Sequence, residues 1–270
     1  MTRMTRLEQI WIYPVKSLPG ICLKNAEIDE RGFVLDRHWM LVEKESGKFV
    51  TQREFPKLSL INLVLNNDTI SLSYKGSHVV SFQRGRNSGN GRLVQVWNDT
   101  VQALVVDPEI DLWFSDILQQ QVSLVEIADD SFRQVDQRFA NETDQTGFSD
   151  GFPFLLLGSA SLDDLNKRIT GDVQMTVERF RPNLVVGGSE PYAEDDWKKI
   201  KIGDVSFNVV KPCSRCSITT IDPSSAVMGK EPLLTLASYR RKGNQVYFGQ
   251  NLIHQSKGHL SEGDVIEVLG

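Results

Sequence analysis

The chemically suggestive part of this 270-residue sequence is KPCSRCSITTIDP (residues 211–223), which holds two of its three cysteines. The spacing of Cys213 and Cys216 suits a disulfide, half of a zinc site, a reactive thiol or a ligand for a softer metal. A structural zinc site needs about four nitrogen or sulfur ligands. Cys22 stands alone, and the four histidines follow no ligand spacing, so the sequence does not favour zinc.

The residues around the two cysteines narrow their chemistry. A thioredoxin-like pair uses a helix N-terminus to activate its thiol, whereas residues 217–222 are predicted to form a strand. A free cysteine is commonly a small buried hydrophobe, and Cys213 fits that description. Cys216 follows Arg215, with Lys211 close in sequence, and a nearby cation favours a thiolate. The residues alone thus indicate one activated thiolate in a locally basic site.

Further polar groups stand where apolar segments begin or end, in the motifs YPVKS, DRHWMLV, FSDGFP, RFRPN and FGQN. Guanidinium groups bind phosphate bidentately, and carboxylate or amide groups match the polar edge of a heterocycle. Singly, each group could be a solvated strand-end charge or a surface ion pair. Together they predict a pocket for an anionic, heterocyclic ligand near the thiolate. The residues are Lys16, Ser17, Arg37, Asp150, Arg181, Asn183 and Asn251.

The composition is that of an ordinary globular protein, with 40% hydrophobic and 24% charged residues. A net charge of -5 argues against general affinity for nucleic acid, so any anion site must be local. The apolar run IWIYPV is interrupted by Pro14 and followed by Lys16, which makes it too short for a signal or membrane segment. Few cysteines, in odd number, suit a reducing compartment, and we expect a cytoplasmic protein.

The first half of the chain is dominated by strand patterns. Short segments rich in β-branched and aromatic residues are separated by compact turns, which favours a sheet curled into a barrel or sandwich. Asp107 and Pro108 then predict a helix start, followed by apolar residues at helical spacing. We place a domain boundary here, after residue 115. The predicted strands are 7–15, 38–45, 58–65, 69–76, 78–84, 92–98 and 100–107.

The second half, residues 116–270, opens with a polar stretch (129–146). A buried strand at 152–158 and a helix at 161–169 capped by Ser161 are predicted to follow. Another helix is expected near 231–241. Strands and helices do not alternate, so a doubly wound sheet is excluded and the expected class is mainly β with a few helices (α+β). The remaining predicted strands are 179–188, 200–210, 217–222, 245–253 and 264–270.

The motifs occur in an order that resembles the MOSC family. The similarity rests on YPVKS, DRHWMLV, VTQREFPKL, FSDGFP, FRPN, CSRCSITTIDP, KEPLLTLASYR and FGQN, and it runs from about Ile10 to the C-terminus. It is similar in particular to the mitochondrial amidoxime reducing component and its bacterial YcbX-like relatives. This resemblance implies a MOSC N-terminal β-barrel domain at 1–115, followed by a MOSC-type β-barrel domain at 116–270.

The resemblance also implies a cofactor, the Mo-molybdopterin form of the molybdenum cofactor, with one protein thiolate on the metal. The matching thiolate is that of Cys216, as metal ligand and catalytic residue, whereas Cys213 is not expected to bind metal. By the same motifs, the phosphate and pterin would be held by Lys16, Ser17, Arg37, Arg181, Ser214 and Arg215. The polar edges of the pterin would contact Asp150, Asn183 and Asn251.

The implied reaction is the two-electron reduction of N-hydroxylated compounds, such as hydroxylamines, amidoximes and N-hydroxylated bases, which would suit detoxification. The chain has too few cysteines for the ferredoxin-type cluster of the bacterial relative, so electrons are expected from a separate flavin, haem or iron-sulfur protein. Two alternatives stay open. One is a cofactor carrier without turnover, and the other is sulfur transfer through a persulfide on Cys216, because MOSC modules occur fused to a sulfurase.

Overall fold

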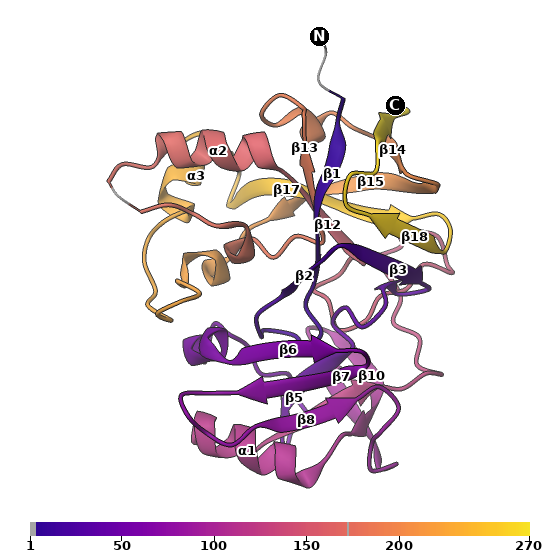
Figure 1. The fold of residues 1–270 in the computed structure, drawn as a ribbon, viewed down its shortest axis with the longest axis vertical. Coiled ribbons are helices and arrows are strands. Elements are labelled where there is room, and N and C mark those ends of the chain that lie inside the picture. Colours follow the sequence, from indigo (N-terminus) through magenta and orange to yellow (C-terminus); the bar gives the residue numbers. More distant parts are fainter. Residues whose placement is uncertain (1–3, 172) are drawn as a thin grey trace.

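The structure, a computed structural model, describes residues 4–171 and 173–270. Its elements form two lobes stacked along the long axis of the molecule (Figure 1). The upper lobe contains a large sheet with helices α2 (Ser159–Arg168) and α3 (Leu233–Tyr239), and the lower lobe contains smaller sheets and α1 (Pro108–Leu118). Within the described ranges, no helix has the length and apolar character needed to span a membrane.

The upper lobe is built on a mainly antiparallel sheet in the order β19-β14-β15-β17-β12-β13-β1-β2, with β16 paired to β17. Only the β12–β13 pair is parallel among the strand pairs described for this sheet. Its strands are β1 (Arg6–Ile12), β2 (Ile21–Leu23), β12 (Phe154–Gly158), β13 (Leu184–Gly187), β14 (Lys199–Ile202), β15 (Val205–Ser214), β16 (Arg241–Lys242), β17 (Gln245–His254) and β19 (Ile266–Val268).

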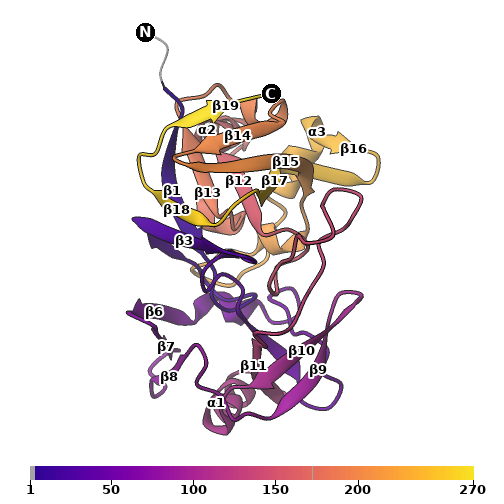
Figure 2. The same cartoon turned by 90° about the vertical axis from the view of Figure 1, so that its right-hand side faces the viewer.

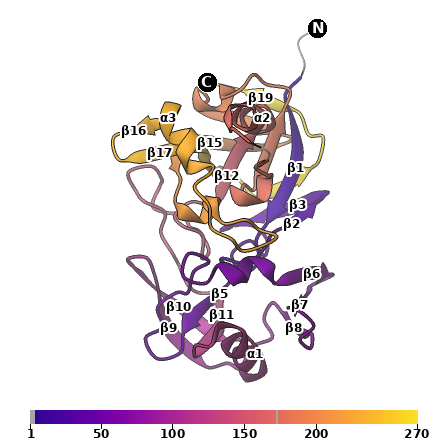
Figure 3. The same ribbon diagram turned by 90° about the vertical axis from the view of Figure 1, so that its left-hand side faces the viewer.

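The large sheet buries apolar side chains on both faces. One face carries a cluster in which the ring of Phe154 packs edge-on against Phe33 and Phe207, at centroid distances of 4.9 and 5.2 Å. The other face is covered by α2 and α3 (Figure 3), whose Leu165 and Leu236 are fully buried. Because β12 and β13 are buried on both faces, their sequences are continuous apolar runs, as expected for central strands.

The lower lobe consists of a four-stranded sheet, β5-β11-β10-β9, and a three-stranded sheet, β6-β7-β8. Helix α1 closes their shared core, and its first turn is capped by Asp107, whose side chain accepts a hydrogen bond from the Glu109 N–H at 2.7 Å. The strands are β5 (Trp39–Glu43), β6 (Asn62–Asn66), β7 (Thr69–Ser73), β8 (Val80–Gln83), β9 (Gly91–Val96), β10 (Asp99–Val105) and β11 (Val122–Ile127).

The two halves of the sequence interleave in space. Strand β1 lies between β13 and β2 in the large sheet, and β3 (Asn25–Asp29) pairs with both β4 (Gly32–Phe33) and β18 (Gly258–Ser261). Conversely, β11 pairs with β5 in the lower lobe. The division into residues 1–115 and 116–270 remains a prediction about sequence modules, because several strands pair across it.

A long irregular segment, residues 128–153, connects β11 to β12 and runs between the lobes (Figure 2). Arg133 fixes its course, because the buried guanidinium donates to the Gly147 and Ser149 carbonyl oxygens at 2.8 and 2.6 Å. The Nε of Arg133 also donates to Asp99 in the lower lobe at 2.8 Å. This segment therefore brings Ser149 and Asp150 to the junction of the lobes.

The mainly β class with a few helices is confirmed, as is the helix start at Pro108. The predicted cap of α2 is wrong: the helix begins at Ser159, and the hydroxyl of Ser161 donates to the buried carboxylate of Glu194 at 2.7 Å. Glu194 also accepts from the Gly158 N–H at 3.0 Å. The carboxylate of Glu194, which comes from another segment, thus accepts the hydrogen bonds at the start of α2. Local sequence could not predict this partner.

The predicted strand at 217–222 is also wrong, because this segment forms the short 3-10 helix η4 (Ser217–Thr220). The hydroxyl of Thr219 donates back to the Cys216 carbonyl oxygen at 3.0 Å, and that of Thr220 donates to Ser217 at 2.7 Å. Such local side-chain hydrogen bonds compete with strand pairing. The β-branched pattern therefore gave the wrong secondary structure at this position.

Candidate active site

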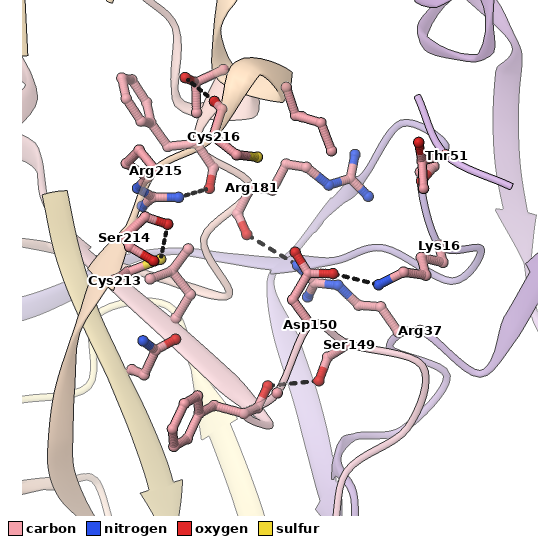
Figure 4. Close-up of a pocket in the computed structure, with 18 of the residues that line it drawn as sticks. Lys16, Arg37, Thr51, Ser149, Asp150, Arg181, Cys213, Ser214, Arg215 and Cys216 are labelled. Carbon is pink, nitrogen blue, oxygen red and sulfur yellow. Dashed lines mark hydrogen bonds and ion pairs between the residues drawn. The ribbon is translucent and has the colours of Figure 1, made fainter. Parts of the chain in front are cut away.

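A solvent-open pocket lies where loops of the two lobes meet, with an empty volume of about 840 Å³ that includes its open mouth. Figure 4 shows residues 213–216, here called the cysteine loop, on one side of the pocket. Lys16 and Thr51 lie on the other side, with Asp150 between them. Every site residue predicted from the sequence lines this pocket. These residues are Lys16, Ser17, Arg37, Asp150, Arg181, Asn183, Ser214, Arg215, Cys216 and Asn251.

The end of β15 places the two cysteines at the pocket. Pairing with β17 continues to Ser214, and the Arg215 N–H donates to the Val246 carbonyl oxygen at 2.7 Å. The chain then turns into η4, where the Cys216 carbonyl oxygen accepts from the Thr219 N–H at 3.2 Å. Cys216 is therefore held at the start of a short helix, with its partly buried sulfur at the pocket wall.

Cys213 and Cys216 differ in environment, and all three cysteines of the chain are free. Burial raises the pKa of the Cys213 thiol, and the nearby Arg215 charge only partly opposes this effect. The Cys213 sulfur lies 3.8 Å from the Ser214 carbonyl oxygen, consistent with a neutral thiol donor. Cys213 is partly buried and lines the same pocket, so the prediction that it does not bind metal remains a prediction.

The two cations expected beside Cys216 make contacts with other groups of the protein. Arg215 donates to the carbonyl oxygens of Phe248 and Phe180 at 2.7 and 2.8 Å. The ammonium group of Lys211 lies 5.0 Å from the ring centroid of Phe139. Among the hydrogen bonds of the described residues, neither side chain donates to the Cys216 sulfur, so an effect of their charges on this thiol remains a prediction and the direct contact comes from another residue.

Arg53 supplies that contact, and the sequence reasoning missed it. Its Nη2 donates to the Cys216 sulfur at 3.4 Å. The loop that carries Arg53 is fixed because the N–H and hydroxyl of Thr51 both donate to Glu54, at 3.1 and 3.0 Å. The available signal was the motif VTQREFPKL, which supports the family resemblance and contains Arg53.

Arg37 and Arg181 share one aromatic support, since each guanidinium carbon lies 4.3 Å from the ring centroid of Tyr13. Arg37 donates to the buried carboxylate of Asp36 at 2.6 Å, and Arg181 donates to the Leu18 carbonyl oxygen at 2.7 Å. Burial lowers the pKa of Arg181 to about 10, and the neighbouring charge of Arg37 adds to this effect. Two like charges are thus held close together, which favours an anion between or beside them.

Three residues of the pocket wall have strained backbone conformations. Ser17, Arg37 and Arg181 adopt positive φ angles of 72°, 47° and 54°, a region that residues other than glycine seldom occupy. Each such residue costs about 1–3 kcal/mol and persists only where surrounding contacts fix it. The strain therefore marks a site whose geometry is maintained at the expense of stability.

Asn183 and Asn251 make bonds within the protein. The Asn183 side chain accepts from Arg37 at 3.1 Å and from the Leu155 N–H at 3.2 Å, and it donates to the Trp11 carbonyl oxygen at 3.1 Å. Asn251 donates to the Lys211 carbonyl oxygen at 3.2 Å. Asn183 thus braces Arg37, and a direct contact of either amide with a cofactor remains a prediction.

Lys16 and Asp150 form an ion pair in the pocket wall. The lysine ammonium donates to Asp150 at 2.5 Å and to the Phe148 carbonyl oxygen at 2.8 Å. Burial lowers the pKa of Lys16 to about 8, and Asp150 offsets part of that decrease. Desolvation acts to raise the pKa of Asp150, but the charges of Lys16 and Arg53 outweigh it, so the net shift is well downward.

Arg179 is a second residue that sequence reasoning missed. It is buried, donates to Asp222 at 2.5 Å, and reaches the Thr219 carbonyl oxygen at 3.5 Å. These contacts clamp the loop that follows Cys216. Arg179 stands two residues before Arg181 in RFRPN, where a strand was predicted from residue 179, but it ends the short 3-10 helix η2 (Val177–Arg179) and the strand β13 begins only at Leu184.

The residues fit the cofactor that the sequence suggested. The pocket wall holds one carboxylate, that of Asp150, against a majority of cations, although the whole chain carries a net charge of -5. Within the described ranges, the Nη2 of Arg215 is buried without a partner, which leaves a donor for an anionic oxygen. A sulfur ligand beside cationic donors suits a soft metal on an anionic support. The cations are Lys16, Arg37, Arg53, Arg179, Arg181 and Arg215.

Comparison with known proteins agrees with this arrangement. Residues 4–121 match the MOSC N-terminal beta barrel domain, and residues 143–267 match the MOSC domain. The chain is 36% identical to human mitochondrial amidoxime-reducing component 1 over 97% of this chain and 82% of that protein. It is 33% identical to human mitochondrial amidoxime reducing component 2, over 88% of this chain and 75% of that protein.

A related protein of another kind is the rice molybdenum cofactor sulfurase. It is 31% identical over 98% of this chain, but the matched part is 34% of the sulfurase. The two domain matches and the extended similarity to the amidoxime-reducing components agree with the motif order and with the pocket. The chain belongs to the family of proteins that join a MOSC N-terminal beta barrel domain to a MOSC domain.

Proposed function

We propose that this protein is a molybdenum-cofactor-dependent reductase of N-hydroxylated compounds. The observation that carries the proposal is the position of the Cys216 sulfur in a cation-lined pocket. The same chain is 36% identical, over 97% of its length, to a protein named for amidoxime reduction. A lone soft ligand among cations is the arrangement that an anionic metal cofactor requires.

The residues of the pocket divide into three roles. The Cys216 thiolate would be the protein ligand to molybdenum. Lys16, Arg37 and Arg181 would neutralise the cofactor's anionic groups, and the hydroxyls of Ser17 and Ser214 would donate to them. The buried supports behind these side chains hold the cations in place before any ligand arrives, which limits the ordering cost of binding.

When bound, the cofactor supplies the two-electron chemistry of the reaction R–NHOH + 2 e⁻ + 2 H⁺ → R–NH2 + H2O. The electrons would come from a separate protein that carries flavin, haem or an iron-sulfur centre. A cytoplasmic location and a role in detoxification belong to the same proposal, and the first is supported by the three free cysteines.

Metal analysis of two matched variants tests the proposal. Protein purified from a host that makes the cofactor should contain about one molybdenum per chain, because one thiolate ligand is available. Cys216→Ala should lose both molybdenum and reduction of benzamidoxime by a chemical reductant, whereas Cys213→Ala should keep most of both. A Cys216→Ala protein that retains metal and activity would refute the assignment.

Sulfur transfer is a second candidate, supported by the similarity to the rice molybdenum cofactor sulfurase over 98% of this chain. In that case intact mass spectrometry should find one labile extra sulfur atom on Cys216 and no bound molybdenum. Molybdenum bound without any reduction of hydroxylamines would instead indicate a cofactor carrier. The same purified protein distinguishes all three functions.

A further inference from the structure

Arg53 differs from the other cations of the pocket wall in what it donates to. In the part of the chain that the structure describes, its hydrogen-bond acceptor is the Cys216 sulfur at 3.4 Å. The Asp150 carboxylate is farther, at 3.9 Å. A guanidinium group carries five N–H donors, so most of those on Arg53 are available to a ligand. The other cations, Lys16, Arg37, Arg179, Arg181 and Arg215, each donate to at least one protein oxygen.

Arg53 is nevertheless held in place, by its flat face rather than by its donors. Its guanidinium carbon lies 4.9 Å from the ring centroid of Trp97, in the turn between β9 and β10. Trp97 adopts a φ of 54°, and its indole N–H donates to Asp150 at 3.1 Å. Phe49 packs against the same indole at a centroid distance of 5.0 Å. Stacking therefore orients the guanidinium without using its N–H groups.

The location of these open donors decides what they can bind. Arg53 comes from the lower lobe and reaches the sulfur of the cysteine loop, which belongs to the upper lobe. Its side chain is 23% exposed, so a molecule entering the pocket can reach it. An oxygen that arrives beside Cys216 would thus meet a preoriented cation with unused donors.

We infer that Arg53 is a substrate-binding residue whose guanidinium donates to the hydroxyl oxygen of an N-hydroxylated substrate beside Cys216. Trp97 is its positioning residue. This inference rests on the proposed function and deepens it, because it names the group of the substrate that the protein recognises. A charge-assisted hydrogen bond of this kind is worth about 1.5–3 kcal/mol, which is at least tenfold in affinity.

A ligand pair that differs in that oxygen provides the test, and the second ligand also carries a positive charge at neutral pH. Benzamidoxime and its deoxygenated product, benzamidine, are titrated into the oxidised holoenzyme by calorimetry without reductant, so that nothing turns over. Arg53→Met should raise the Kd of benzamidoxime about tenfold or more, whereas the Kd of benzamidine, a cation that the arginine charge repels, should stay the same or fall. Arg86→Met is the matched control, because Arg86 is an exposed arginine of the same lobe.

The positioning role of Trp97 has its own comparison. Trp97→Phe keeps an aromatic face for Arg53 and should bind benzamidoxime nearly as the wild type does. Trp97→Leu removes that face and should weaken benzamidoxime binding severalfold, in the same direction as Arg53→Met. Arg53→Lys retains the charge but loses the planar stack, so its Kd should fall between those of the wild type and Arg53→Met.

Each contrary result has a distinct meaning. Loss of molybdenum from Arg53→Met would show that Arg53 holds the cofactor, and it would overturn the inference. An equal loss of affinity for both ligands would overturn it too, because the hydroxyl oxygen would then not be recognised. Failure of the proposed function appears in the wild type, as absent molybdenum or absent reduction of benzamidoxime, whereas failure of this inference appears only in the variants.

Discussion

The ammonium nitrogen of Lys16 lies 2.5 Å from a carboxylate oxygen of Asp150, and this ion pair is unequally buried. The Lys16 side chain is 7% exposed, whereas that of Asp150 is 62% exposed. Desolvation acts on both groups, but the charges of Lys16 and Arg53 keep the Asp150 carboxylate ionised, whereas for the Lys16 ammonium group burial outweighs the opposing charge. The pocket contains a buried cation whose charge is only partly compensated by the protein.

This asymmetry predicts a pH-dependent stability. Burial lowers the pKa of Lys16 to about 8 in the folded protein, below the ordinary value of 10.5. Between these values the unfolded chain binds more protons than the folded one, so the contribution of Lys16 to the free energy of unfolding rises with pH. The slope from one group is at most about 1.4 kcal/mol per pH unit.

Urea unfolding at several pH values across that window checks this prediction. The unfolding free energy of the wild type minus that of Lys16→Met should rise with pH, since other titrating groups cancel in the difference. Lys242→Met is the control, because Lys242 is exposed, and its difference should stay flat. A flat difference for Lys16→Met as well would contradict the depressed pKa.

Tyr13 supports Arg37 and Arg181 with its ring, whereas its buried hydroxyl has no partner among the described residues. Tyr13→Phe should therefore leave stability unchanged or slightly higher, because an unsatisfied polar group is removed. Tyr13→Leu should cost about 2–4 kcal/mol, through lost packing and lost cation–π contacts. Chemical denaturation measures both, and equal losses in the two variants would show that the hydroxyl matters.

Arg179, at the end of the 3-10 helix η2 (Val177–Arg179), holds the loop after Cys216 through Thr219 and Asp222. Arg179→Met should cost about 1–3 kcal/mol, because Asp222 loses one partner but keeps its hydrogen bonds to Ser224. The loosened loop should also release molybdenum faster on dialysis. Arg84→Met is the control, since Arg84 forms an exposed ion pair at 3.4 Å, and its change should stay within about 0.5 kcal/mol. Similar losses in both variants would argue against a clamp.

Gly249, within β17, adopts a φ of 77°, and a Cβ there would lie 2.7 Å from the Leu156 carbonyl oxygen. Gly249→Ala should therefore combine backbone strain with a backbone clash and cost more than about 2 kcal/mol. The added methyl would also approach Arg215 and disturb the cysteine loop. Gly243→Ala, at a φ of 60° with open space around it, should cost only about 1–2 kcal/mol. Thermal unfolding of both variants compares the two effects.

Several features of the fold and of the site could be predicted from residue types and local spacing alone. Asp107 and Pro108 predicted the start of α1, because a side-chain cap and the fixed φ of proline act within a few residues and apolar residues at helical spacing follow them. The β-branched segments were likewise sufficient for the mainly β class. The order of the motifs predicted site residues as far apart in the chain as Lys16 and Asn251. All of the predicted site residues line one pocket.

Tertiary structure alone decided which partner each side chain found. Arg215 is adjacent to Cys216 in the chain, yet Arg53, 163 residues away, contacts its sulfur. Asn183 braces Arg37 from within the protein, and Glu194 serves the start of α2 from a distant segment. The physical reason is that hydrogen bonds and ion pairs depend on distances of a few ångströms between side chains. Residue types and local spacing determine which groups are available, whereas the packing of the two lobes determines which of them meet.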